Sequence, residues 1–352
     1  MTKVVLPFLS LLFACLSLVM LKSIYPQGVF SQFFAFTLGF ITYGITSSLP
    51  FSFWKKWSIL LFILVCTSLV FTFALGKTTN GSTRWIAVGT AQFQPSQATK
   101  PILALYLCTL LYSKKKKIWQ LVFALLPIFL VFIQPDLGTA LILLVITFLS
   151  LYTCGISART LGMFVFLMSL FGTIGWTFVF HDYQKQRLFS FLAPASDTLG
   201  QGYHAQQAII AVGSGKFFGR GLGHGVQSSL RFLPERQTDF MFASYAEELG
   251  FVGVLLLFLL YLLFFFSLIH LSFRIHDPAG KGLALTIVGA LSVQTMMNIG
   301  MNIGLLPIAG VTLPLLSLGG SSIVSIFFAL GLLASAYKAN RSRHLVEIRG
   351  FV

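Results

Sequence analysis

The chain is poor in charged residues, which make up only 9% of its 352 residues. Hydrophobic residues supply 56%, and the mean hydropathy is +0.87. This share of apolar residues is larger than a soluble domain of this length needs. The scarcity of charge therefore excludes a soluble enzyme or binding module and places the chain in a lipid bilayer.

Acidic residues are scarcer still, with nine Asp and Glu against 24 Lys and Arg, and none precedes Asp136. The formal net charge of +15 could suggest nucleic acid. However, basic residues gather at 114–117 and 338–349, beside predicted helix ends, where they orient helices and touch anionic lipid. We therefore expect a membrane surface, and no nucleic acid, as the partner of this charge.

Cysteine, histidine and glycine patterns argue against three further kinds of site. The four cysteines lie inside apolar runs without C-x-x-C spacing, which argues against disulfides and a zinc site. The six histidines show no metal-ligand spacing. The glycine-rich segment 213–225 has neither a P-loop pattern nor a strand-borne G-x-G-x-x-G, so no nucleotide site follows from it.

Long apolar runs recur along the chain, many of them about 18 residues or more, the length that crosses a hydrocarbon core of roughly 30 Å. They predict an all-α polytopic membrane protein of about ten transmembrane helices, one domain over 1–352 with a large extracytoplasmic loop at 181–249. The excess of Lys and Arg on one set of short loops predicts that both termini are cytoplasmic. The helices are expected near 4–22, 28–49, 57–75, 97–112, 118–133, 138–155, 160–180, 250–273, 282–304 and 316–337.

Seven of the nine acids fall on the predicted outer side, so chemistry is expected there. In the first outer loop, Arg84 and Trp85 precede a helix whose start is predicted at Pro95-Ser96, with Ser96 as the candidate N-cap. Lys100 lies one turn inside this helix, and a cation within the membrane calls for an anionic partner or ligand. Two alternatives stay open, because Lys100 can also snorkel to the headgroups and Arg84-Trp85 can be an interfacial anchor.

Three acids on the outer side have spacing that suggests a role. Asp136 follows a proline between two predicted helices, where capping of the next helix is favoured over contact with a substrate. Asp239 precedes a predicted helix, whose N-terminus stabilises an anion, and it is a candidate base. Glu247 lies about 12 Å further along a helix, too far for a glycosidase carboxylate pair with Asp239. It is interpreted as an acid that supports the site or caps a helix, or as a catalytic one.

Two other outer segments contain candidate contacts. The long loop carries Arg187 and a Gly-rich stretch with Lys216 and Arg220. Lys216 and Arg220 either meet a lipid-linked phosphate or belong to a solvated turn. The segment 298–322 is rich in Gly and Pro and predicts non-helical backbone, which must be buried in protein or line a cavity. It is interpreted as the wall of a lipid-accessible groove, or as a hinge that serves packing alone.

Five blocks, taken together and in order, resemble the SEDS family of peptidoglycan glycosyltransferases, nearer its RodA branch than its FtsW branch. They are NGSTRWI (80–86), FQPSQATK (93–100), QPDLGTA (134–140), LPERQTDFMFASYAEELG (233–250) and NIGMNIGLLPIAGVTLPLLSLGGSS (298–322). The LPER form of the fourth block favours the RodA branch. The match extends over nearly the whole chain.

The resemblance implies polymerisation of lipid II at the outer leaflet of the bacterial cytoplasmic (inner) membrane during cell-wall elongation, with inversion and loss of undecaprenyl diphosphate. Asp239 matches the family's essential aspartate, which implies a general base or a ligand to a divalent cation such as Mg or Mn. The implied partners are a class B penicillin-binding transpeptidase and the elongation machinery. The residues expected to bind substrate are Lys100, Arg84, Trp85, Arg187, Glu247 and Asp136.

One departure from the family concerns Gln97, which stands where the family usually has Glu, three residues before Lys100 on the same helix face. Lys100 then pairs with Asp239 or Asp136, or points at substrate phosphate, and the sequence leaves both open. A flippase for lipid-linked precursors and a non-catalytic scaffold are the competing functions. A flippase needs a polar path to both leaflets, whereas the acids gather on one side, which favours the polymerase.

Overall fold

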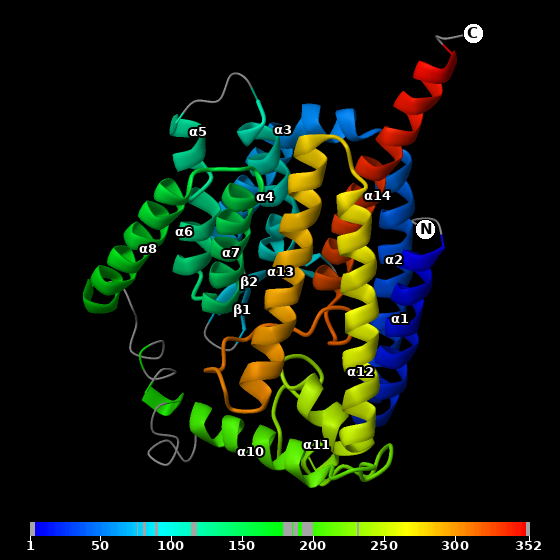
Figure 1. Cartoon of the computed structure of the whole chain (residues 1–352). Helices are drawn as coiled ribbons and strands as arrows, with labels where there is room; N and C mark the ends of the chain where they lie inside the picture. The colour runs from blue at the N-terminus through cyan, green and yellow to red at the C-terminus, as the bar shows by residue number, and fades with distance from the viewer. Residues whose placement is uncertain are drawn as a thin grey trace.

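The computed structural model describes residues 4–75, 77–79, 82–88, 91–113, 118–178, 185, 189–191, 200–230 and 232–349. Within these ranges the chain is a bundle of long helices, with a small sheet at its side and short helices at one end (Figure 1). The long helices are α1 (Val5–Ile24), α2 (Val29–Ser48), α3 (Phe51–Leu75), α4 (Pro95–Leu111), α7 (Leu137–Thr153), α8 (Ala158–Phe178), α12 (Met241–Phe273), α13 (Pro278–Asn302) and α14 (Gly320–Arg349). The shorter ones are η1 (Pro26–Gly28), α5 (Ile118–Phe123), α6 (Leu126–Ile133), α10 (Gln201–Ser214) and α11 (Val226–Ser229).

Seven stretches of the described helices are long and apolar enough to cross a membrane, and they comprise α1, η1 with α2, α3, α8, α12, α13 and α14. Two shorter apolar stretches, Trp119–Ile133 and Leu137–Thr153, accompany them. The chain is therefore the all-α, multi-pass membrane protein that its composition predicts. The count of ten spans stays a prediction.

Helix boundaries differ from the predicted ones at informative places. The helix expected at 118–133 is broken between α5 and α6, just before Pro127, which has no N–H to continue the hydrogen-bond ladder. The helix expected from residue 250 begins at Met241, because a short helical stretch precedes a kink at Gly250 (φ 66°). The capping prediction for Ser96 is wrong, since Gln94 is the N-cap residue of α4.

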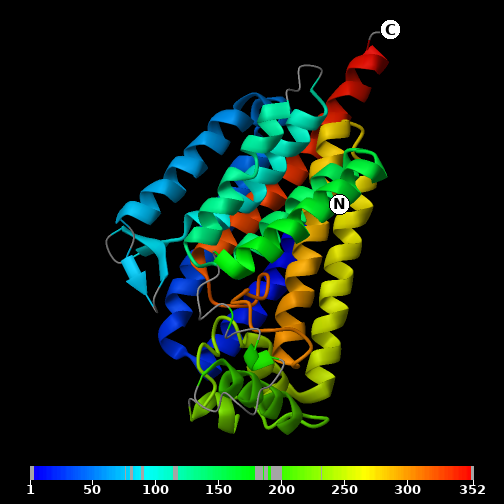
Figure 2. The same cartoon turned by 90° about the vertical axis from the view of Figure 1, so that its left-hand side faces the viewer.

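A three-stranded antiparallel sheet lies between α3 and α4, where the sequence predicted only turns. Its strands are β1 (Lys77–Thr79), β2 (Ser82–Val88) and β3 (Ala91–Phe93), in that order. Figure 2 shows the sheet projecting beside the end of α3. Arg84 and Trp85 therefore lie on a strand and have defined neighbours.

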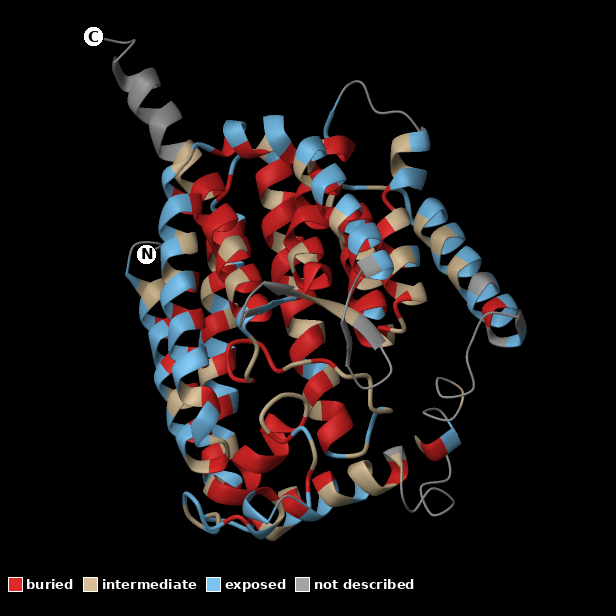
Figure 3. Ribbon diagram, turned by 180° about the vertical axis from the view of Figure 1, so that it is seen from behind, coloured by how far each residue is buried: buried red, intermediate tan, exposed pale blue. Residues whose placement is uncertain are grey.

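Burial is uneven across the bundle (Figure 3). Most of α13 and the membrane-spanning part of α14 are buried, whereas α8 is almost wholly exposed. The buried helices carry polar side chains that face the non-helical segment 303–319 between them. This buried polar region lies towards the end of the bundle where α10 and α11 lie (Figure 1).

Candidate active site

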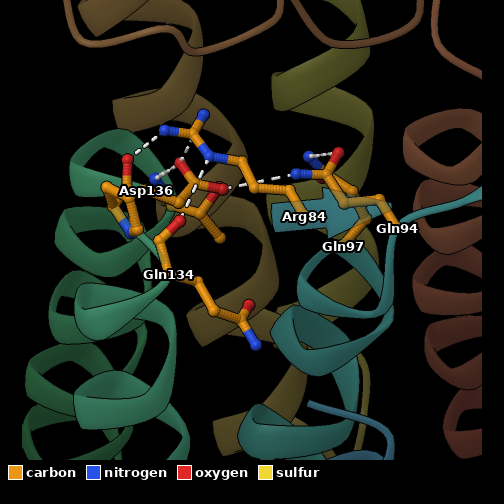
Figure 4. A network of polar contacts seen from close by, with 7 residues as sticks. Arg84, Gln94, Gln97, Gln134 and Asp136 are labelled. Carbon is orange, nitrogen blue, oxygen red and sulfur yellow. Dashed lines mark hydrogen bonds and ion pairs between the residues drawn. The ribbon is translucent and has the colours of Figure 1, made fainter. Parts of the chain in front are cut away.

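A buried ion pair joins the sheet to the junction between α6 and α7 (Figure 4). Arg84 Nη1 on β2 lies 3.7 Å from Asp136 Oδ1, and the Asp136 side chain is only 3% exposed. Arg84 also donates to the backbone carbonyls of Gln134 and Pro135. A buried carboxylate needs compensating donors, and Asp136 receives them from within the chain.

Asp136 also connects two helices. Its Oδ1 accepts from the backbone N–H of Thr139 at 3.2 Å, so the predicted cap of α7 is confirmed. Its Oδ2 accepts from Gln94 Nε2 at 3.3 Å, and Gln94 Oε1 accepts from Gln97 Nε2 at 3.4 Å. The Asp136 carboxylate thus fixes the start of α4 relative to α7, and the neutral residue at 97 belongs to the same network.

Lys100 lies on the next turn of α4 and reaches α13. Its ammonium donates to Gln294 Oε1 at 3.2 Å. Lys100 and Gln97 line a small cavity of about 30 Å³, together with Gln294, Ser322 and Ser325 and apolar side chains. Lys100 is the one charged side chain among these lining residues.

Three buried amide side chains on α13 form what we call the amide ladder, comprising Gln294, Asn298 and Asn302. They are spaced by four residues and therefore lie on one helix face. Asn298 Nδ2 and Asn302 Nδ2 donate to the backbone carbonyl of Asp239 at 2.9 and 3.1 Å. Asn302 Oδ1 accepts from the backbone N–H of Ala243 at 3.0 Å. The ladder therefore fixes both Asp239 and the first turn of α12.

The amide ladder also holds the segment 303–319. Asn298 Nδ2 donates to the Val311 carbonyl at 2.6 Å, and Gln294 Nε2 donates to the Thr312 carbonyl at 2.9 Å. Non-helical backbone inside a membrane protein needs such partners. The non-helical backbone expected within 298–322 is thus present and bonded to α13.

The two networks meet on either side of the 303–319 segment. Gly138, two residues after Asp136, packs against the Ala309 carbonyl so closely that a Cβ at 138 would collide with it. Gly310, which follows Ala309, lies beside Asp239, because a Cβ at 310 would be 3.6 Å from Asp239 Oδ2. The 303–319 segment therefore lies between the start of α7 and Asp239.

Glu247 is fully buried in the first part of α12 and binds α11. Its Oε1 accepts from the backbone N–H of Gln227 at 2.8 Å, and its Oε2 accepts from the backbone N–H and the hydroxyl of Ser228 at 3.0 and 2.7 Å. The structure thus shows the capping role among the alternatives for Glu247. Contact with a substrate stays a prediction.

Trp85 and Arg187 are the two other predicted substrate contacts. Trp85 is half-buried on β2 and pairs in register with Lys77. Arg187 lies outside the described residues. The structure therefore unites Arg84 with Asp136, and links Lys100 with Asp239 through the amide ladder.

The sequence reasoning missed the amide ladder and Gln94. A signal for the ladder was present, because Gln294, Asn298 and Asn302 recur every four residues in a mainly apolar helix. Polar side chains inside a membrane are costly and call for partners or function. Gln94 gave no such signal, since its role depends on the approach of Asp136 from another helix.

A divalent cation was the alternative role for Asp239. The described residues contain no cluster of three or more His, Cys, Asp or Glu side chains that could enclose a metal by themselves. Mg commonly binds one or two carboxylates together with substrate phosphates. The donors present therefore fit a cation only if Asp239 shares it with a diphosphate.

The helices cross the bilayer, and an aspartate is fixed at one end of the bundle beside a buried non-helical segment. These features define a multi-pass membrane protein with a buried polar site. A family model described as cell cycle protein, and named for FtsW, RodA and SpoVE, matches residues 2–342. The chain belongs to this family, which confirms the resemblance to SEDS proteins.

Relatives and solved structures agree with this assignment. The chain is 38% identical over 306 residues to peptidoglycan glycosyltransferase MrdB of Escherichia coli (strain K12), covering 85% of this chain and 83% of MrdB. It is 35% identical to stage V sporulation protein E of Bacillus subtilis (strain 168), covering 89% and 85%. A chain from a peptidoglycan synthase complex superposes with a TM-score of 0.80 at 29% identity, over 95% of this chain and 96% of that one. RodA of Thermus thermophilus superposes at 0.71 and 26% identity, over 95% of each chain.

Proposed function

We propose that the chain is a peptidoglycan glycosyltransferase that polymerises lipid II during cell-wall elongation, with Asp239 as general base. The observation that carries this proposal is the setting of Asp239, whose main chain is held by the amide ladder while Gly310 lies beside its carboxylate. The name and 38% identity of MrdB support the same activity.

The proposed reaction uses Asp239 to take up one proton. The 4-hydroxyl of the acceptor gives its proton to the Asp239 carboxylate while its oxygen bonds to the anomeric carbon of the donor. The bond from that carbon to the diphosphate oxygen breaks, and undecaprenyl diphosphate leaves with the electron pair. Attack opposite the leaving group inverts the anomeric centre. A positioned base of this kind contributes about 10²- to 10⁴-fold to the rate.

Lys100 is the proposed contact for the donor diphosphate. Its ammonium is held by Gln294, on the same ladder that positions Asp239, so the cation and the base are fixed relative to one another. A divalent cation shared by Asp239 and the diphosphate would neutralise charge on the leaving group. Substrate contacts by Arg84, Trp85, Arg187, Asp136 and Glu247 stay predictions.

The cellular setting follows from the same family membership. We place the chain in the bacterial cytoplasmic (inner) membrane with both termini cytoplasmic, as the distribution of Lys and Arg predicts. A class B penicillin-binding transpeptidase and the elongation machinery are the proposed partners. The similarity to a chain of a complex that couples polymerisation to crosslinking supports a partner of this kind.

The test is polymerisation of purified lipid II by the full-length protein in detergent, alone and with the candidate transpeptidase, with products resolved by gel electrophoresis. Wild type should form glycan chains, and Asp239→Asn should form none. Glu235→Gln is the matched control, because Glu235 is an exposed carboxylate in the same loop, and it should retain activity. If wild type forms no polymer with its partner but moves lipid II across vesicle bilayers, the chain is a flippase.

A further inference from the structure

An exposed loop next to the kink of α12 combines aromatic and basic side chains. We call residues 216–220 the aromatic loop. Phe217 and Phe218 are 65% and 83% exposed, and Lys216 and Arg220 are exposed as well. None of these four side chains takes part in the networks around Asp239 and Asp136.

Backbone hydrogen bonds fix the aromatic loop to the kink. Gly250, with φ 66°, interrupts α12 and leaves backbone groups on both sides without helical partners. The Arg220 N–H donates to the Glu247 carbonyl at 3.0 Å, and the Phe251 N–H donates to the Lys216 carbonyl at 2.9 Å. The loop therefore has a defined height relative to residue 251.

The position of the aromatic loop along α12 coincides with one surface of the hydrocarbon core. The part of α12 beyond the kink, 251–273, is about 34 Å long at ~1.5 Å per residue, against a core of roughly 30 Å. The end of α1, a second candidate span, gives the same level, because Ser23 Oγ donates to Glu248 Oε1 at 2.7 Å. Phe251 therefore lies at the boundary between hydrocarbon and headgroups.

The aromatic loop also lies on the lipid-facing side of α12. Phe251, Leu255 and Leu259 follow i, i+4 spacing and are 56%, 57% and 51% exposed, so they form an apolar stripe that faces lipid. The rings of Phe217 and Phe251 lie 5.6 Å apart. Phe217 thus continues this stripe beyond the end of the span.

We propose that the aromatic loop is seated in the lipid leaflet on the Asp239 side, where it binds anionic phospholipid headgroups. Phe217 and Phe218 enter the boundary between headgroups and acyl chains, where aromatic residues concentrate in membrane proteins. Lys216 and Arg220 meet lipid phosphates, whose charge complements theirs. The loop fixes the depth of the kink and hence of the helical stretch 241–249 that follows Asp239.

The test measures how closely bilayer lipids approach position 218. The full chain carries Phe218→Cys labelled with a bimane dye, in a background of Cys15→Ala and Cys154→Ala that leaves only the buried Cys66 and Cys108. It is reconstituted into nanodiscs containing either brominated phosphatidylglycerol or brominated phosphatidylcholine. The matched positions are Leu259→Cys, inside the hydrocarbon, and Glu235→Cys, on an exposed polar loop.

Brominated lipid should quench the dye at 218 strongly, as it quenches the dye at 259, whereas the dye at 235 should be quenched little. The quenching at 218 should be several-fold stronger with phosphatidylglycerol than with phosphatidylcholine. Lys216→Gln with Arg220→Gln should remove the preference for the anionic lipid and keep the quenching. If the dye at 218 is quenched as little as the dye at 235, the proposal is overturned, and the loop is then a candidate contact for a protein partner. Equal quenching by both lipids in the unchanged loop also overturns it, because the cations then do not meet headgroups.

Discussion

The hydrogen bonds described above hold Asp136 and Asp239 at different atoms. Asp136 is bound through its carboxylate, which receives Arg84, Gln94 and the N–H of Thr139. Asp239 is bound through its main chain, whose carbonyl accepts from Asn298 and Asn302. The Asp136 carboxylate is thus the centre of its network. The amide ladder instead positions the main chain of Asp239.

This difference separates a structural acid from a candidate base. The Asp136 carboxylate is occupied by donors from three other residues, so it serves the packing of β2 and α4 against α7. A base must change its protonation state during the reaction, so positioning through the main chain suits it better. We therefore expect the two aspartates to affect different properties, Asp136 stability and Asp239 turnover.

The largest effect is expected from Asp239→Asn, which keeps the shape of the side chain and removes the base. Polymerisation of lipid II should fall by at least about 100-fold. The thermal unfolding midpoint should stay close to that of wild type, because the amide ladder binds the main chain of residue 239. Initial rates and thermal unfolding in detergent measure both. A large fall in the midpoint would place Asp239 with the structural acids.

Asp136→Ala should instead destabilise the protein by about 3 kcal/mol, because it leaves a half-buried Arg84 without its carboxylate and removes the cap of α7. Asp277→Ala is the matched control, since Asp277 likewise caps a helix and pairs with a cation, Lys55, at 2.9 Å. Those side chains are 21% and 34% exposed, so the control should lose only about 1 kcal/mol. Equal losses in denaturant unfolding would mean that burial of the Asp136 network adds nothing.

The amide ladder should show an intermediate effect. Asn298→Leu removes the donor to the Val311 carbonyl, and an unsatisfied carbonyl costs about 1–3 kcal/mol. It also leaves Asn302 as the remaining ladder donor to the Asp239 carbonyl. We expect a lower kcat with KM little changed, because the base is displaced while Lys100 keeps its partner. Thr295→Val is the matched control, because the Thr295 hydroxyl bonds only within α13, to Leu291. If both variants lose the same activity, the ladder has no special part in positioning Asp239.

Several features around Asp136 and Asp239 could be predicted from the sequence, because they depend on local patterns. The cap at Asp136 is confirmed because the residues that decide it, Pro135 to Thr139, are neighbours in the chain. The kink of α12 falls at Gly250, where the sequence placed a helix start. Local composition also predicted the non-helical backbone within 298–322.

The rest depends on contacts between distant residues or on signals too short to detect. The carboxylate of Asp136 meets Gln94 only after α4 and α7 pack, so nothing near residue 94 predicts it. Ser96 matched the cap pattern, yet the helix starts one residue before it. The sheet had one overlooked sign, Asn80-Gly81 between its first two strands, a dipeptide typical of hairpins.

The smallest effect is expected from Gln97→Glu, which introduces the family's usual carboxylate at the point where the two networks meet. Gln97 lies one turn before Lys100, and both line the same cavity. The change removes the hydrogen bond that Gln97 donates to Gln94, so stability should fall by about 1 kcal/mol. KM for lipid II should rise a few-fold, because a carboxylate beside Lys100 offsets the charge that we assign to the diphosphate.

Gln97→Met is the matched variant for this prediction, because it keeps the length of the side chain and adds no charge. Steady-state polymerisation should give it a KM close to that of wild type, so that only the charged replacement raises KM. The expected difference between the two variants should shrink in Lys100→Ala, since the carboxylate then has no cation to offset. If Glu and Met at position 97 give the same KM, Lys100 does not contact the diphosphate, and the neutral residue at 97 serves only the network of Gln94 and Asp136.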